Sequence, residues 1–497
     1  DREPRPDLAA PADRGPRRLR HRDARRPTAG RGAPLDGHAR DPRPRRGHPD
    51  RPDRALADRP HRRRRQPRRH QGERRPRGAR RRSVRRRRGP GGRRGPVPGH
   101  PAALPAGAGS GPVIRSLYLH IPFCERKCEY CDFASVAGRR GEAEYVEALR
   151  WEIRQLAGAV PGTVLDTVFV GGGTPGLIEP ARLAAILDEV RSGFALAPGA
   201  EVTIEANPSS TSASRAAAWR EAGCTRVSLG VQSLEPDVLR FLGRVHDAGR
   251  ALAAVAEVRE GGFEQVSCDL IYAVPGLDDA RWAATVERLL DLDPGHLSCY
   301  ELTVEEGTPL HRAVGRGAVR VVDAEIALRQ HWVAVDLASA AGYRQYEVSN
   351  LARPGLECRH NLAYWRNRHY LAAGTGAHGH LPPAAARALG LVDDPGDAVA
   401  VRYWHVRSPD RFTAIASGRR LPVEGFELLG AAAHEAERVM VGLRLAGGVA
   451  VEEEGPRREA QELAAGGLLE WDGHTARATR RGQEVLNAVV ERLVGAR

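Results

Sequence analysis

From Ser116 onward the chain alternates between short runs rich in β-branched residues and longer stretches rich in Ala, Glu, Arg and Leu. This alternation is typical of βα units and predicts an α/β fold built on a parallel sheet or barrel. Ligands of parallel barrels bind where the strands end, and each predicted strand here runs into a polar or glycine-rich segment. The predicted strands are 116–122, 166–171, 201–206, 226–231, 265–272 and 296–302. The predicted helices between them are 142–158, 180–192, 211–222, 235–242 with 247–260, and 278–291.

Three cysteines, Cys124, Cys128 and Cys131, follow the first predicted strand in the spacing C-x3-C-x2-C. Three thiolates can hold three irons of a [4Fe–4S] cluster and leave the fourth iron open for another ligand. The alternatives are a partial zinc site or three unrelated buried thiols. Structural zinc sites prefer four ligands from two short cysteine hooks, and no second hook is present. We therefore predict that these cysteines bind a [4Fe–4S] cluster.

The residues around the cysteines, Tyr118-Leu-His-Ile-Pro-Phe-Cys124 and Cys128-Glu-Tyr-Cys131, resemble the radical S-adenosylmethionine superfamily. They are most similar to the branch that contains the oxygen-independent coproporphyrinogen III dehydrogenases and the heme chaperones. The resemblance implies a partial (βα)6 TIM-like barrel in which S-adenosylmethionine chelates the open iron of the cluster. It also implies that an electron from the cluster cleaves this cofactor to methionine and a 5′-deoxyadenosyl radical.

The resemblance further implies S-adenosylmethionine contacts at the ends of the other strands. The loop Gly171-Gly-Gly-Thr-Pro175 lets a ligand approach the backbone closely. Glu205 would accept hydrogen bonds from ribose hydroxyls, and Arg244 would pair with the methionyl carboxylate. Taken alone, a glycine triplet, a strand-end carboxylate or a single arginine is more often a turn or a surface group. The implied S-adenosylmethionine residues are Tyr118, Gly172, Gly173, Thr174, Glu205, Gln232, Arg244 and Asp269.

Two features separate the close relatives within this branch. The dehydrogenases carry a fourth cysteine two residues after the third, where this chain has Phe133. The segment Cys358-Arg-His-Asn-Leu-Ala-Tyr-Trp365 resembles the H-N-x-x-Y-W motif of the heme chaperones. The alternative is that the histidine and asparagine hold a turn and the aromatic residues belong to the core, and Cys358 is a second candidate iron ligand. The residues that the resemblance assigns to heme are His360 as iron ligand, with Asn361, Tyr364 and Trp365.

We therefore predict a heme chaperone that binds heme and delivers it to respiratory apoproteins. The alternative is an oxygen-independent coproporphyrinogen III dehydrogenase, which forms protoporphyrinogen IX by oxidative decarboxylation, so the sequence leaves open whether the chain is an enzyme. The four remaining cysteines are scattered singly, which favours a reducing, cytoplasmic location. No apolar run approaches the roughly 18 residues that span a bilayer, so membrane contact is expected only at the periphery. A homodimer is left open.

The first 115 residues differ from the rest of the chain. They contain 36 Arg, 11 acidic residues and no Phe, Trp or Tyr, a net charge of +25; the whole chain carries +15, so residues 116–497 carry 15 − 25 = −10. Such a segment cannot bury enough apolar surface to order itself, and we predict disorder. Its composition favours a misplaced start or frame artefact over an RNA-binding arm, and it lacks the apolar core of a targeting segment. Because the body is acidic, no nucleic-acid partner is expected.

Residues beyond 115 exceed one typical domain. We predict a barrel over 116–310, an extension with the H-N-x-x-Y-W motif over 311–425, and a C-terminal α+β domain over 426–497. In that domain we expect a hairpin that turns at Asp472-Gly473. Its order of elements resembles the winged-helix-like tail of the family, and its mixed charge favours docking to a protein or membrane partner. The expected helices of the domain are 426–445, 459–465 and 480–493.

Overall fold

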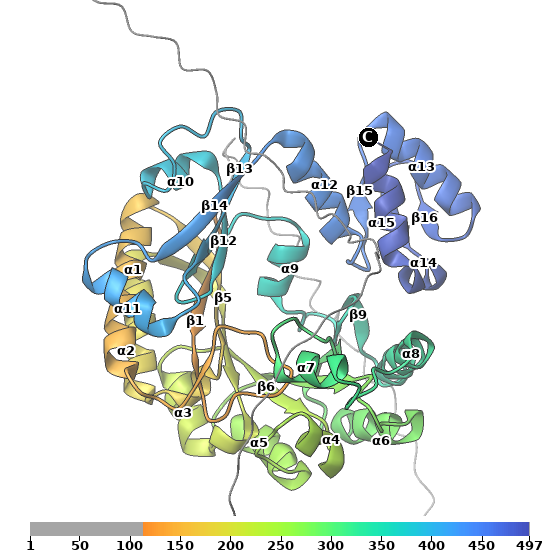
Figure 1. Ribbon diagram of the computed structural model, residues 1–497, viewed down its shortest axis with the longest axis horizontal. Coiled ribbons are helices and arrows are strands. Elements are labelled where there is room, and N and C mark those ends of the chain that lie inside the picture. Colours follow the sequence, from red (N-terminus) through yellow and green to blue (C-terminus); the bar gives the residue numbers. More distant parts are fainter. Residues whose placement is uncertain (1–112, 497) are drawn as a thin grey trace, which may run out of the picture. The chain divides into compact units, whose positions relative to one another are not determined.

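The computed structural model describes residues 113–496, so the predictions for residues 1–112 lie outside the described range. A nine-stranded sheet forms its centre. Six strands of this sheet are parallel and lie side by side in the order of the sequence, as predicted (Figure 1). These strands are β1 (Ser116–Ile121), β4 (Val164–Gly172), β5 (Ala195–Ala206), β6 (Arg226–Gln232), β7 (Gln265–Tyr272) and β8 (Gly295–Glu301).

Three short strands extend the sheet at its two ends. β11 (Leu371–Ala373) pairs in parallel with β1, whereas β10 (Asn350–Ala352) pairs antiparallel with both β8 and β9 (Arg344–Glu347). Among the described residues the sheet ends at β11 on one side and at β9 on the other. The sheet is therefore a partial barrel, as expected, and not a closed one.

The predicted helices cover the outside of the strands (Figure 1). Three of them begin at a polar side chain, Ser212, Asp247 or Asp278, that accepts a hydrogen bond from the backbone N–H three residues later. This capping satisfies a backbone donor that the helix itself leaves free. These outer helices are α1 (Glu142–Ala159), α2 (Pro180–Gly193), α3 (Ala213–Glu221), α4 (Pro236–Phe241), α5 (Ala248–Glu260) and α6 (Asp279–Leu290).

The segment after the barrel adds a second, three-stranded sheet. Its strands are β12 (His378–Leu381), β13 (Ala400–His405) and β14 (Val423–Leu429), paired antiparallel in that order. The prediction of a helix from residue 426 was wrong, because residues 423–429 pair with β13 and the helix α12 is Ala431–Gly442. The other helices of this region are α7 (Pro309–Gly315), α8 (Ala324–Ala340), α9 (Arg359–Trp365), α10 (Pro383–Ala388) and α11 (Pro409–Ser417).

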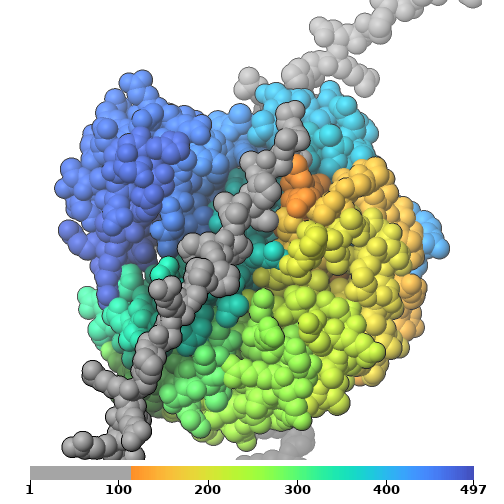
Figure 2. Space-filling view, turned by 180° about the vertical axis from the view of Figure 1, so that it is seen from behind, coloured from red at the N-terminus to blue at the C-terminus, as the bar shows by residue number. Residues whose placement is uncertain are grey.

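The C-terminal residues have their own hydrophobic core, which includes Val439, Leu463 and Leu493. In the space-filling view they form a compact lobe, coloured blue (Figure 2). The predicted hairpin is present as β16 (Leu469–Trp471) and β17 (Thr475–Ala478), with β15 (Val449–Ala450) paired to β17. Helix α13 is Glu454–Ala465 and is longer than predicted, and the last helix is divided into α14 (Arg480–Glu484) and α15 (Leu486–Gly495). No helix of the described residues is both long and apolar enough to cross a bilayer.

A buried ion pair joins the barrel to the second sheet. The Glu152 carboxylate on α1 lies 2.5 Å from Nε2 of His405 on β13, and both side chains are at most 1% exposed. The other carboxylate oxygen accepts a hydrogen bond from the backbone N–H of Gly374, at the end of β11. Burial lowers the pKa of His405, but the Glu152 charge and hydrogen bond outweigh it and raise the pKa above its usual value. The pair therefore fixes the loop after β11 against α1.

We expect E152Q to reduce the free energy of unfolding by about 3–5 kcal/mol near pH 6, because it leaves a buried imidazolium without its counter-charge. The raised pKa means that the stabilisation is complete below about pH 6.5 and is lost as the pH rises through the folded-state pKa. Urea unfolding at pH 6 and pH 9 measures this difference. The exposed Glu147 provides the control E147Q, and a loss of stability equal at both pH values would contradict a charged pair.

Candidate functional site

A cavity of about 710 Å³ opens where the parallel strands end. The three predicted cluster cysteines and all eight predicted S-adenosylmethionine residues line it. Of the predicted heme residues, His360, Asn361 and Tyr364 line it as well, whereas Trp365 does not. The structure therefore brings together residues that are up to 246 positions apart, from Tyr118 to Tyr364 (364 − 118 = 246).

The cysteines lie on one short loop at the end of β1. Cys124 ends strand β2 (Phe123–Cys124), which pairs with β3 (Val136–Ala137), and the segment between these strands holds Cys128 and Cys131. The loop is fixed from inside: Nε2 of His120 contacts the carbonyl oxygen of Ala134 at 3.0 Å. The strand pairing and this contact hold the loop at both ends and in its interior. All three cysteines line the same cavity.

Donors from other strands reach two of the thiols. The hydroxyl of Thr174 donates to Sγ of Cys124 at 3.7 Å, and Nη1 of Arg244 donates to Sγ of Cys128 at 3.5 Å. Burial raises the pKa of the Cys124 and Cys131 thiols. Iron would favour the thiolate form, because metal ligands must be deprotonated.

The three thiols fit the predicted cluster, because they line one cavity. Among residues 113–496 no three His, Cys, Asp or Glu side chains are grouped as ligands of a single metal ion. A [4Fe–4S] cluster instead binds each cysteine to a different iron, so it needs three thiols around one space. Phe133, in the position of the fourth cysteine of the dehydrogenases, lies at the cavity and is 62% exposed.

The glycine loop at the end of β4 packs too closely for side chains. Gly172 has a φ of +113°, and a Cβ there would lie 2.5 Å from the His120 ring. A Cβ on Gly173 would lie 2.7 Å from the backbone of Pro122. Glycine therefore allows this loop to contact the end of β1, and the N–H of Gly172 donates to the carboxylate of Glu205 at 2.9 Å.

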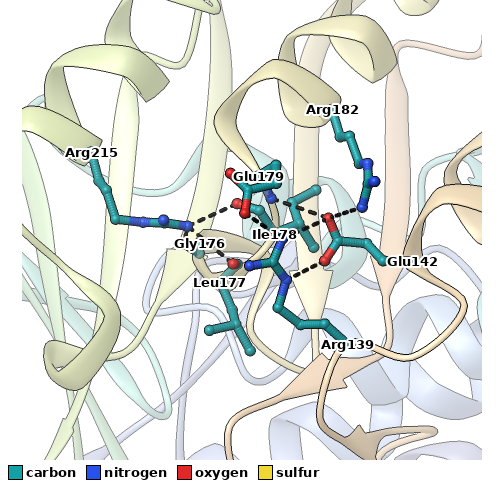
Figure 3. Close-up of polar contacts among 8 residues, drawn as sticks. All are labelled: Arg139, Glu142, Gly176, Leu177, Ile178, Glu179, Arg182 and Arg215. Carbon is teal, nitrogen blue, oxygen red and sulfur yellow. Dashed lines mark hydrogen bonds and ion pairs between the residues drawn. The ribbon is translucent and has the colours of Figure 1, made fainter.

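Arg215 on α3 holds the turn that follows the glycine loop (Figure 3). Its Nη2 donates to three successive backbone carbonyl oxygens at 2.8–3.0 Å. A guanidinium is suited to this role because it offers several donors in one rigid plane. The three accepting carbonyls belong to Gly176, Leu177 and Ile178.

The other side of this turn is held by Glu142, the first residue of α1 (Figure 3). Its carboxylate is 2% exposed and pairs with Arg139 and Arg182. It also accepts a hydrogen bond from the backbone N–H of Glu179 at 3.2 Å. Since charged hydrogen bonds are the stronger ones, this network holds the first helix and the glycine loop in a fixed relation.

Arg244 and Asn207 connect the remaining strand ends. Nη2 of Arg244 donates to the carbonyl oxygen of Gly230 at 2.9 Å and also to Oδ1 of Asn207. The Asn207 amide in turn donates to the hydroxyl of Thr174 at 2.9 Å. Gln232, at the end of β6, has a φ of +64°, a strained conformation that is common at functional sites. The guanidinium is therefore held beside the cysteine loop, where an anionic ligand group can reach it.

Two carboxylates, Glu205 and Asp269, line the cavity from β5 and β7. Burial, followed by the charge of Asp269, raises the pKa of Glu205 to about 8. Burial also raises the pKa of Asp269, whose oxygens accept hydrogen bonds from the hydroxyl of Ser228 at 3.0 Å. A ligand that brings hydroxyl donors would favour the ionised form of Glu205.

The helix α9 carries three of the four predicted heme residues to the cavity, and Glu201 on β5 caps this helix. The Glu201 carboxylate accepts hydrogen bonds from the backbone N–H groups of Arg359 and His360, each at 3.0 Å. Nδ1 of His360 contacts the hydroxyl of Thr167 at 2.8 Å, and Nε2 contacts the hydroxyl of Tyr364 at 2.8 Å. Both ring nitrogens of this fully buried histidine thus have partners.

Two residues that organise the site, Asn207 and Glu201, were not predicted from the sequence. Asn207 directly follows the predicted strand 201–206, but only the structure shows that it joins Thr174 to Arg244. Glu201 begins the predicted third strand, and its role depends on a helix 158 positions away. The position of Asn207 at the end of a predicted strand could have indicated a site residue. No local pattern indicated that Glu201 contacts α9.

Residues 118–289 match the family model described as the Radical SAM superfamily. The chain is 41% identical over 385 residues to the "Heme chaperone HemW" of Mycobacterium tuberculosis (strain ATCC 25618 / H37Rv), covering 76% of this chain and 94% of that protein. It is 34% identical over 407 residues to the "Radical S-adenosyl methionine domain-containing protein 1, mitochondrial" of Bos taurus, covering 78% and 88%. The solved structure of coproporphyrinogen III oxidase (HemN) from Escherichia coli matches with a TM-score of 0.63 at 20% identity, covering 77% of this chain and 90% of that one. At that identity the likeness shows a shared fold.

We expect E205Q to gain free energy of unfolding relative to the wild type as the pH rises. The difference between variant and wild type should be larger at pH 8 than at pH 5 by roughly 1–3 kcal/mol. The folded-state pKa of Glu205 is raised, so the wild type loses stability as the pH rises from about 4.5 to about 8, and the amide does not. Chemical unfolding in the absence of S-adenosylmethionine, with the exposed-site variant D188N as control, measures the difference. A pH-independent difference would contradict the raised pKa.

Proposed function

Because the chain belongs to the heme chaperone HemW family of radical S-adenosylmethionine proteins, we propose that it binds heme and delivers it to an apoprotein. The observation that carries this proposal is that α9 presents His360 and Tyr364 to the same cavity as the three cysteines. One cavity thus holds a candidate iron ligand, an aromatic side chain and the three thiols.

The surroundings of His360 keep its imidazole neutral and oriented, as a metal ligand requires. Burial lowers its pKa to about 3, so the imidazole is neutral, as ligation requires. The Thr167 hydroxyl donates to Ser116 and so accepts from Nδ1–H of His360, which assigns the lone pair to Nε2. Such a hydrogen bond at the remote nitrogen orients a ligating histidine. Iron would replace the Tyr364 hydroxyl at Nε2.

The family implies a [4Fe–4S] cluster and S-adenosylmethionine, and the residues present fit them. When bound, the cluster supplies an electron that can cleave the cofactor. We infer that Cys124, Cys128 and Cys131 hold the cluster, while Arg244 pairs with the methionyl carboxylate. Glu205 would accept hydrogen bonds from the ribose. The further contacts that we infer are Tyr118, Gly172, Gly173, Thr174, Gln232 and Asp269.

As acceptors we propose respiratory apoproteins, reached from the cytoplasmic side, with the chain itself peripheral to the membrane. The C-terminal residues have a core of their own, which supports a docking role for them. We further propose a barrel domain over 116–310, an extension from 311 that includes all of β14, and a C-terminal domain that begins after this strand rather than at 426. We do not favour the function of a coproporphyrinogen III dehydrogenase. Where the dehydrogenases carry a fourth cysteine, this chain has Phe133, and that side chain is exposed.

We expect H360A to weaken heme binding by at least about tenfold, a typical loss when a metal site is disturbed. Y364F keeps the ring and removes the hydroxyl that occupies Nε2 of His360, so it should bind heme as tightly as the wild type or more tightly. Titration with heme, followed by absorbance, measures both.

Two controls accompany this titration. Iron and sulfide content should be unchanged in both variants, because the side chains that hydrogen-bond the cluster thiols are Thr174 and Arg244 and neither is altered. H378A removes an exposed histidine that does not line the cavity and should leave the affinity unchanged. Heme affinity of H360A equal to that of the wild type would contradict ligation by His360.

A further inference from the structure

A buried guanidinium lies in the cavity without an ion pair. Arg226 begins β6, is 1% exposed and lines the cavity below the strand ends. Its Nη1 donates to the carbonyl oxygen of Leu356 at 3.0 Å, whereas Nη2 has no hydrogen-bond partner. None of the ion pairs among residues 113–496 includes this side chain. A buried charge is costly unless it is paired, so this arrangement calls for an anion.

A second unpartnered group lies beside it. Thr203 on β5 is paired in register with Arg226 on β6, is fully buried and lines the same cavity. Its hydroxyl also has no hydrogen-bond partner. Neighbouring strands project side chains of paired residues to the same face of the sheet, so the hydroxyl and Nη2 are presented to one space.

The nearby titratable groups are already occupied. The carboxylate of Glu201 accepts from the backbone at the start of α9. The carboxylate of Asp269 accepts from serine hydroxyls and interacts with Arg226 through its charge, with no ion pair or hydrogen bond between the two side chains. Both nitrogens of His296 have partners, in Ser267 and Tyr346. Burial, followed by the charge of Arg226, holds the pKa of His296 well below its usual value, so it adds no second cation. The guanidinium of Arg226 is therefore the positive group that can bind an anionic ligand here.

We propose that Arg226 and Thr203 form an anion site on the floor of the barrel that takes a carboxylate. One carboxylate oxygen accepts from Nη2 and the other from the threonine hydroxyl, which satisfies both unpartnered groups and neutralises the buried charge. The carboxylate comes either from a small free anion or from an arm of a larger ligand in the cavity, such as a propionate of heme. The second source rests on the proposed function, and the first does not.

The first test uses formate as the probe on the full chain, in buffer free of other carboxylates. Formate is expected to raise the melting temperature of the wild type in a saturable way, and not that of R226M. R191M, an arginine variant outside the cavity, should respond like the wild type. T203V retains the guanidinium and should need a several-fold higher formate concentration for half-maximal stabilisation. This variant provides the test if R226M does not fold. Equal responses of wild type, R226M and T203V would overturn the site and leave water as the partner of these groups.

The second test identifies the source of the carboxylate by comparing heme with its dimethyl ester. If R226M weakens heme binding several-fold and leaves the binding of the ester unchanged, the carboxylate belongs to the ligand. If formate protection is lost in R226M while heme and ester bind as in the wild type, the site takes a free anion. A wild type that binds no heme but responds to formate would contradict the proposed function and not this site. Loss of affinity for both porphyrins alike, without a formate effect, would overturn the proposal.

Discussion

Parallel pairing of six strands is the constraint on which the site depends. In a parallel sheet all carboxyl ends meet at one edge, so the cysteine loop, the glycine loop, Glu205 and Arg244 face one cavity although they are distant in sequence. The hydrogen bonds between these loops then fix their relative positions: Thr174 contacts both Cys124 and Asn207, and Asn207 contacts Arg244. A cluster and its cofactor would thus enter a site that is already organised.

The interior of the barrel is polar, which distinguishes it from a packed core. Serine, threonine and carboxylate side chains from β5 to β8 line the cavity, together with Arg226 and His360. Buried polar groups are costly unless they are hydrogen-bonded, and most of these are. The exceptions, Nη2 of Arg226 and the hydroxyl of Thr203, lie together, which is why they indicate a ligand. The helix α9 is hydrogen-bonded to β4 and β5 through His360, and it brings His360, Asn361 and Tyr364 to the cavity.

Local sequence signals were sufficient for the six parallel strands and the outer helices, because each depends on neighbours in the chain. The residues at the strand ends were assigned from the family resemblance, and the structure places them at one cavity. The β14 strand was missed because residues 423–429 adopt it by pairing with β13, a contact that propensity does not encode. The pairing of Glu152 with His405, the capping of α9 by Glu201 and the orientation of Trp365 away from the cavity also depend on tertiary packing. Such contacts join segments that no local pattern relates.

We propose that this site serves heme transfer rather than porphyrin synthesis. The most direct test is an anaerobic assay of the cluster-loaded protein with S-adenosylmethionine, reductant and coproporphyrinogen III, with C128A and porphyrin-free controls. Chromatography would quantify protoporphyrinogen IX and 5′-deoxyadenosine. We expect no porphyrin product, and we expect the same preparation to bind heme. Protoporphyrinogen IX formed in proportion to 5′-deoxyadenosine would contradict it and identify a dehydrogenase.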